Sequence, residues 1–140
     1  MTDKLTKAKE LLENFDWTCV LVKGYSTSTS ALHGIRPIME WLKENAAALN
    51  GASIADKVVG KAAALLMAYG KAAEVYAGVI STPAKEVLQK NNIALEYGTE
   101  VPLIQNREGT GNCPMEAACL HTDSPEEAYA ILSEKLNGPL

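Results

Sequence analysis

The stretch EVYAGVISTPAKEVLQKNNIALEYG, residues 74–98, decides the fold. EVYAGVI (74–80) predicts a buried strand, IALEYG (93–98) predicts another, and AKEVLQKNN (84–92) between them has a helical pattern. Ser81 and Thr82, followed by proline, predict the start of that helix. Because a single helix joining two strands favours parallel pairing, this stretch predicts an α/β protein.

Upstream of this stretch, hydrophobic periodicity predicts three helices, over residues 3–14, 35–49 and about 56–69. A hairpin is predicted between the first two. Its first strand, WTCVLV (17–22), is apolar enough to be buried on both faces, and its second, YSTSTS (25–30), is polar and suits a sheet edge.

Downstream, the polar stretch QNREGTGN (105–112) precedes a short helix over 113–121 and a last helix that starts at 123 or 124 and ends near 136. The order of strands and helices predicts a three-layer α-β-α sandwich with a mixed sheet, folded as one domain over residues 1–140. Ligands are then expected at the carboxyl ends of the parallel strands.

Composition narrows the classes of function. The 140 residues are 47% hydrophobic and 21% charged, which is typical of a globular domain, and the net charge of -4 disfavours binding to nucleic-acid polymers. The sequence has no signal peptide pattern and no apolar run of the roughly 18 to 20 residues that span a bilayer, so we expect a cytoplasmic protein without a membrane partner. The three cysteines are odd in number and unpatterned, and we interpret them as reduced thiols.

Two helix starts carry candidate ligand-binding residues. In ADKVVGK, Lys57 and Lys61 are predicted on one helical face, where they would repel each other and favour an acidic ligand or neighbour. The alternative is that Asp56 neutralises Lys57 and that both ammonium groups reach solvent. Ser81 and Thr82 offer a second anion site at a helix N-terminus, although capping alone is the favoured interpretation.

A third candidate segment is the polar loop that ends in GTGNCPME (109–116). Cys113 falls at or beside a helix N-cap, where the dipole lowers a thiol pKa, and Glu116 reaches back to the same turn. Asn106, Arg107 and Thr110 add polar groups to this loop. The structural alternative is a buried cysteine that fills an apolar gap while Glu116 completes a cap. The cysteine and histidine spacing predicts no metal site and no cofactor.

The motifs ADKVVGKAAALL, VYAGVIS and GTGNCPME resemble those of a small prokaryotic family of unknown function in the cytidine deaminase-like superfamily. The resemblance covers about residues 15–122 and implies a deaminase-like mixed sheet with helices on both faces. Zinc deaminases carry His-x-Glu and Pro-Cys-x-x-Cys at two helix starts. By element order these positions fall on residues 55–57 and 81–85, which contain no histidine or cysteine, so zinc-dependent deamination is not predicted.

Two functions of different classes follow. The first is a metal-free domain that binds a small anionic metabolite or nucleotide, with Asp56, Lys57, Asn106 and Arg107 orienting the ligand. The alternative is a metal-independent enzyme in which Cys113 is a nucleophile or redox thiol and Lys57 or Glu116 transfers protons. A homo-oligomeric scaffold is a third, less specific option.

Overall fold

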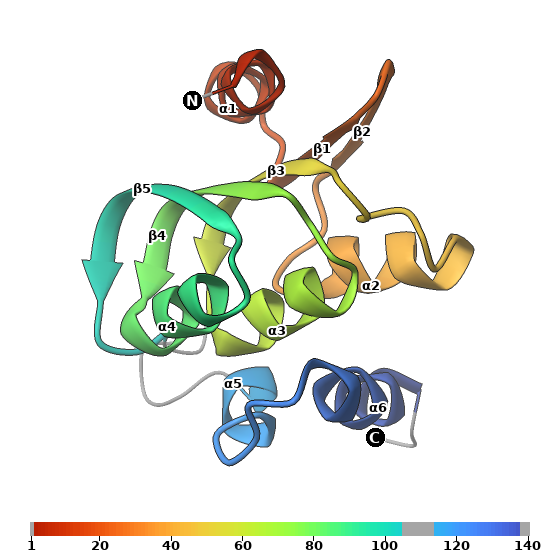
Figure 1. Ribbon diagram of the computed structural model, residues 1–140, viewed down its shortest axis with the longest axis vertical. Helices are drawn as coiled ribbons and strands as arrows, with labels where there is room; N and C mark the ends of the chain where they lie inside the picture. The colour runs from red at the N-terminus through yellow and green to blue at the C-terminus, as the bar shows by residue number, and fades with distance from the viewer. Residues whose placement is uncertain (1, 105–113, 138–140) are drawn as a thin grey trace.

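The computed structural model describes residues 2–104 and 114–137 (Figure 1). Its strands are β1 (Cys19–Lys23), β2 (Ser26–Ser30), β3 (Ser53–Val59), β4 (Glu74–Ser81) and β5 (Ala94–Val101). Its helices are α1 (Asp3–Asn14), α2 (Arg36–Glu44), α3 (Lys61–Tyr69), α4 (Thr82–Lys90), α5 (Pro114–Ala118) and α6 (Pro125–Asn137). None of these helices is both long and apolar enough to cross a lipid bilayer.

The strands form one mixed sheet in the order β2-β1-β3-β4-β5. β1 is antiparallel to both β2 and β3, whereas β3, β4 and β5 run parallel. The predicted hairpin, its polar edge strand and the parallel later strands are therefore confirmed. Because β3 and β4 each feed a helix that returns along the sheet, the carboxyl ends of the parallel strands share one edge with the starts of α3 and α4 (Figure 1).

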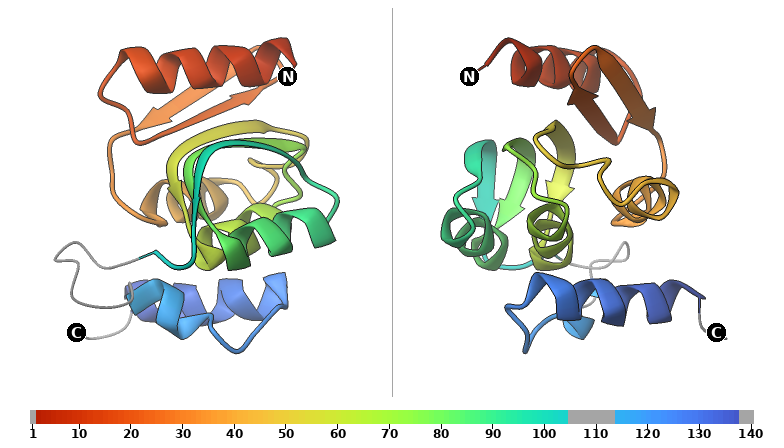
Figure 2. Two further views of the ribbon diagram at one scale, coloured as in Figure 1. Left: turned by 90° about the vertical axis from the view of Figure 1, so that its left-hand side faces the viewer. Right: turned by 45° about the vertical axis from the view of Figure 1, so that its right-hand side comes forward.

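Helices cover both faces of the sheet, which confirms the predicted three-layer α/β sandwich (Figure 2). α1 lies on one face, where its buried Leu5, Ala8 and Leu12 pack against alternate strand residues such as Val20 and Val22. α2, α3 and α4 cover the other face and enclose the larger core. α5 and α6 pack on the outer side of α3 (Figure 1).

The third predicted helix is wrong at its N-terminal end. Residues 53–59 form β3, which pairs with β1 and β4, and the helix begins only at Lys61. The segment contains three β-branched residues that fit a central strand, Ile54, Val58 and Val59. The charged residues Asp56 and Lys57 between them gave the segment a helical periodicity. Lys57 therefore lies in a strand and Lys61 in a helix, so the shared helical face is wrong as well.

Candidate functional site

A cavity of about 660 Å³ opens beside the carboxyl end of β3, against the start of α2 and the first residues of α5. Ile35, Ala62, Ala63 and Met115 contribute apolar wall. The polar and charged residues that line it come from four separate segments of the chain, namely Thr18, His33, Arg36, Asp56, Lys57 and Glu116. The cavity is of ligand size, and an apolar wall with a few polar groups is typical of small-molecule sites.

Asp56 is held in the cavity wall by the pairing of β3 with β1, in which it lies opposite Cys19. Asp56 is only 5% exposed. Its Oδ1 atom accepts a long hydrogen bond from the Val58 N–H at 3.4 Å, whereas Oδ2 is buried and has no hydrogen-bond partner among the described residues. Burial raises the Asp56 pKa to about 7, and the weaker effects of the Val58 N–H and the Cys19 thiol lower it.

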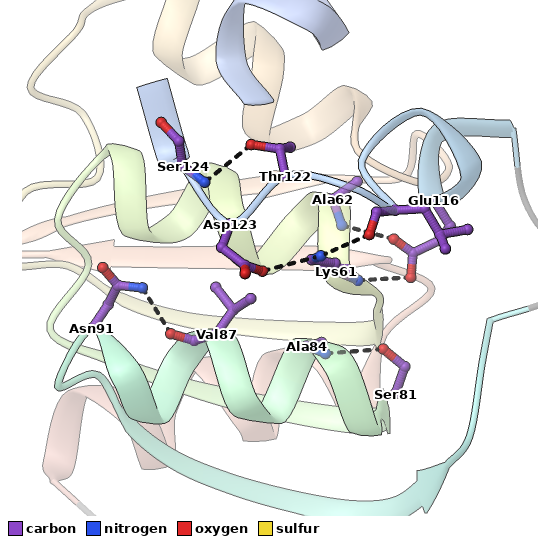
Figure 3. A network of polar contacts seen from close by, with 11 residues as sticks. Lys61, Ala62, Ser81, Ala84, Val87, Asn91, Glu116, Thr122, Asp123 and Ser124 are labelled. Atoms are coloured by element: carbon purple, nitrogen blue, oxygen red, sulfur yellow. Dashed lines mark hydrogen bonds and ion pairs between the residues drawn. The ribbon is translucent and has the colours of Figure 1, made fainter. Parts of the chain in front are cut away.

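Glu116 has the opposite environment. Its Oε1 atom accepts the Lys61 N–H at 2.6 Å and its Oε2 atom accepts the Ala62 N–H at 2.7 Å, so the carboxylate caps the N-terminus of α3 (Figure 3). A Cβ atom at Gly60 would overlap this carboxylate, which explains why glycine stands at the N-cap. The sequence predicted that Glu116 reaches back to its own turn, but it instead caps a helix 55 residues earlier in the chain.

The two lysines of ADKVVGK have separate roles. Lys57 is exposed and lines the cavity. Lys61 points to the segment after α5, where its Nζ forms an ion pair with Asp123 at 3.1 Å and donates to the Leu120 carbonyl at 3.2 Å (Figure 3). The hydrogen bond from Lys61 lowers the Asp123 pKa. Lys61 thus has the acidic neighbour expected for it, and it is not among the residues that line the cavity.

Ser81 and Thr82 have structural partners at the start of α4. The buried Ser81 hydroxyl accepts the Ala84 N–H at 3.2 Å, which is an N-cap bond (Figure 3). The Thr82 hydroxyl donates to Glu100 Oε2 at 2.8 Å. The hydrogen bond from Thr82, with that from Lys85, lowers the Glu100 pKa. Neither Ser81 nor Thr82 lines the cavity, and these contacts match the favoured interpretation of capping.

Four predicted site residues, Asn106, Arg107, Thr110 and Cys113, lie outside the described residues. Their roles stay predictions. Thr18, His33 and Arg36, in contrast, line the cavity and were not predicted as site residues. A signal for Thr18 exists in the hairpin: because β1 runs antiparallel to β3, its beginning lies at the carboxyl end of β3, next to Asp56.

The residues at the two helix starts do not fit a zinc site. Residues 55–57, where element order put the first ligand motif, lie inside β3, so that placement is wrong. α3 starts with Gly60, Lys61 and Ala62, and α4 starts with residues 81–85, and neither start contains histidine or cysteine. Within residues 2–104 and 114–137, no three His, Cys, Asp or Glu side chains gather in a metal-binding group.

Fold and cavity together define an α/β sandwich domain with a ligand-sized hollow beside its parallel strands. The chain belongs to the DUF1893 family: the family model TM1506, a domain of unknown function, matches residues 7–136. It is similar to the crystal structure of a DUF1893 family protein (TM1506) from Thermotoga maritima, with 30% identity and a TM-score of 0.87 over 96% of this chain and 91% of that chain. No curated protein matches the chain.

Proposed function

We propose that the chain binds a small anionic metabolite or nucleotide in the cavity beside β3, without a metal ion. The observation that carries this proposal is the cavity of about 660 Å³, in whose wall the carboxyl residue Asp56 and the exposed cationic residues Arg36 and Lys57 meet an apolar surface. A ligand-sized cavity with an apolar wall and a few polar groups is typical of a small-molecule site.

The balance of charge around the cavity supports an anionic ligand. Lys57 and Arg36 line it, and both side chains belong to exposed residues. The negative groups count for less, because Glu116 is bonded to two backbone N–H groups of α3 and because the raised Asp56 pKa leaves that carboxyl partly neutral at pH 7. The remaining cationic groups favour a negative charge on the part of the ligand nearest the solvent.

The arrangement of the sheet supports the deaminase-like ancestry that the motifs imply, which is part of this proposal. Helices lie on both faces of a mixed sheet, and the cavity lies beside the strand that leads into α3. Since the helix starts offer no zinc ligands, we propose a cavity that binds a ligand without the superfamily's metal chemistry.

The alternative of a thiol enzyme depends on Cys113, which lies outside the described residues. The two described thiols are unsuited to that role. Burial, followed by the charge of Asp56, raises the Cys19 pKa, and burial with the charge of Glu116 raises the Cys119 pKa to about 11. An alkylation rate of Cys113 at neutral pH no faster than that of a free peptide cysteine would contradict the enzyme alternative.

A binding screen of the full chain against anionic metabolites and nucleotides, read by amide chemical shifts, tests the proposed function. We expect shifts at the cavity residues and an affinity that falls at least about fivefold, about 1 kcal/mol, in the Lys57→Ala variant. Lys4→Ala, an exposed change on α1 at the opposite face of the sheet, is the matched control. Equal affinities in the two variants, or no binding by any compound, would overturn the proposal.

A further inference from the structure

We infer that the ligand of the cavity beside β3 is amphipathic, with one anionic group, a carboxylate or a phosphate, on a short hydrocarbon body. The body lies inside the cavity and the anionic group stays on the solvent side. This inference rests on the proposed function, and it adds the chemical class of the ligand and the direction in which the ligand enters. It separates such a ligand from a polar one, such as a sugar phosphate, that would be held by charge alone.

Burial divides the lining of the cavity into an apolar interior and a charged mouth. The interior is formed by residues that line the cavity and are buried, namely Ile35, Ala62 and Ala63. The mouth is formed by Arg36 and Lys57, which line the same cavity and are exposed. Since covering apolar surface is favourable and burying an unpaired charge is costly, a ligand that matches this lining carries its hydrocarbon inward and its charge toward solvent.

The polar groups deeper in the lining already have neighbours within the protein. Both Glu116 oxygens accept N–H groups of α3. The Thr18 hydroxyl donates to two backbone carbonyls. The Oδ2 atom of Asp56 is buried, and the Cys19 thiol lies beside that carboxyl. The surface that these residues leave to a ligand inside the cavity is therefore mainly apolar.

Exposed apolar residues lie around the same cavity. Val58 lines it and is 45% exposed although it belongs to a central strand. Leu32 and Leu103 are also exposed, and they directly precede His33 and Ile104, which line the cavity. Single exposed apolar residues are common, but several around one ligand-sized hollow are typical of a binding site. Their position supports a ligand with apolar surface of its own.

The experiment titrates butanoate, hexanoate and octanoate into the full-length protein at about pH 7, where each carboxylate is ionised, and reads binding by amide chemical shifts. We expect the affinity to rise about threefold for each added methylene, because each one buries more hydrocarbon in the interior. Lys57→Ala should lower the affinity of all the alkanoates by one common factor, because they share the anionic group. The control 1-octanol has the chain without the charge, and its binding should not respond to Lys57→Ala.

A filled interior tests the direction of entry. Ala63→Leu adds a larger side chain to the buried lining, so octanoate should lose at least about tenfold in affinity while butanoate loses less than about threefold. Urea unfolding checks that the variant folds. If it does not, Met115→Ala removes apolar wall at a less buried position, and octanoate should lose about fivefold. Leu120→Ala, an exposed apolar residue that does not line the cavity, is the matched control.

The outcomes separate this inference from the proposed function. An affinity that is the same for every chain length, but still falls in Lys57→Ala, would overturn the inference and leave the proposed function intact. Octanoate binding that is unchanged in both Ala63→Leu and Met115→Ala would place the chain outside the cavity and overturn the inference. Binding of no alkanoate would overturn it as well, and the screen of anionic metabolites and nucleotides then decides the proposed function alone.

Discussion

Two carboxylates share the wall of one cavity and differ in what surrounds them. Glu116, on the short helix α5, has a backbone N–H donor for each of its oxygens. Asp56, on the central strand β3, is more deeply buried, and one of its oxygens has no partner in the described part of the chain. The structure therefore uses Glu116 to hold α5 against α3, whereas the Asp56 carboxyl has only a long hydrogen bond from the Val58 N–H and the thiol of Cys19 beside it.

This difference predicts opposite effects from the same chemical change. At Glu116, replacing the carboxylate by an amide of the same shape removes a charge that backbone N–H groups stabilise. At Asp56, the same replacement removes a charge that burial penalises. The free energy of unfolding of isosteric variants at the two positions measures the contrast directly, and the larger change is expected at Asp56.

Asp56→Asn has the largest expected effect, and it is stabilising at alkaline pH. The folded protein keeps the Asp56 proton up to its pKa of about 7, whereas the unfolded chain loses it near 3.8. The folded state thus binds more protons in this window, and the stability of the natural protein falls as pH rises through it. At about 1.4 kcal/mol for each pKa unit, the variant should gain up to about 4 kcal/mol over the natural protein.

Urea unfolding between about pH 4 and about pH 8 checks this prediction, with the exposed Asp16→Asn as a matched control. The difference between Asp56→Asn and the natural protein should grow up to about pH 7 and then stay constant. A difference that is the same at every pH would show that Asp56 is ionised in the folded protein, and the comparison of the two carboxylates would then fail.

Glu116→Gln should destabilise the protein by about 2 kcal/mol, because it weakens two charge-assisted hydrogen bonds at a helix N-terminus. The amide also turns an NH₂ group toward one of the two backbone N–H donors. Urea unfolding gives the magnitude, and Glu134→Gln, an exposed change on α6, is the control. If the two Gln variants are equally stable, the cap on α3 contributes nothing measurable.

Gly60→Ala tests the same cap from the side of the helix. The added Cβ would overlap only the carboxylate of Glu116 among its nearest atoms, so the cap is displaced at a cost of about 1.5 kcal/mol. In the Glu116→Ala background the same substitution meets no carboxylate, and it should cost only about 0.5 kcal/mol, which reflects the preference for glycine over alanine at an N-cap. A double-mutant cycle of unfolding energies measures this difference, and additive effects would contradict the contact.

The features that the sequence predicts correctly depend on interactions between residues that are close in the chain, and the features that it misses depend on distant ones. The hairpin and the start of α4 depend on neighbours a few residues apart, and both were predicted correctly. β3 was missed because its identity as a strand comes from pairing with β1 and β4, while its own residues include two charges. Asp56 was singled out for its charge, but its burial opposite Cys19 could not be predicted without the register of that pairing.

The cap on α3 shows the same limit within the candidate site. The sequence offered a capping role for Glu116 only as the structural alternative and placed the cap in its own turn, whereas the helix that it caps begins 55 residues earlier, so no local pattern identifies the partner. The glycine at residue 60 is the local consequence of this contact, because a Cβ atom there would overlap the Glu116 carboxylate.

Ser81→Ala has the smallest expected effect and provides the contrast between a local cap and a distant one. The Ser81 hydroxyl accepts the Ala84 N–H three residues ahead, and its loss should cost about 1 kcal/mol. Since Ser81 does not line the cavity, binding of the anionic compounds that the screen identifies should be unchanged, whereas Glu116→Ala alters the wall of the cavity as well as stability. A weaker affinity in Ser81→Ala would mean that the ligand site extends to the start of α4, and that Ser81 and Thr82 bind the anion as the sequence first allowed.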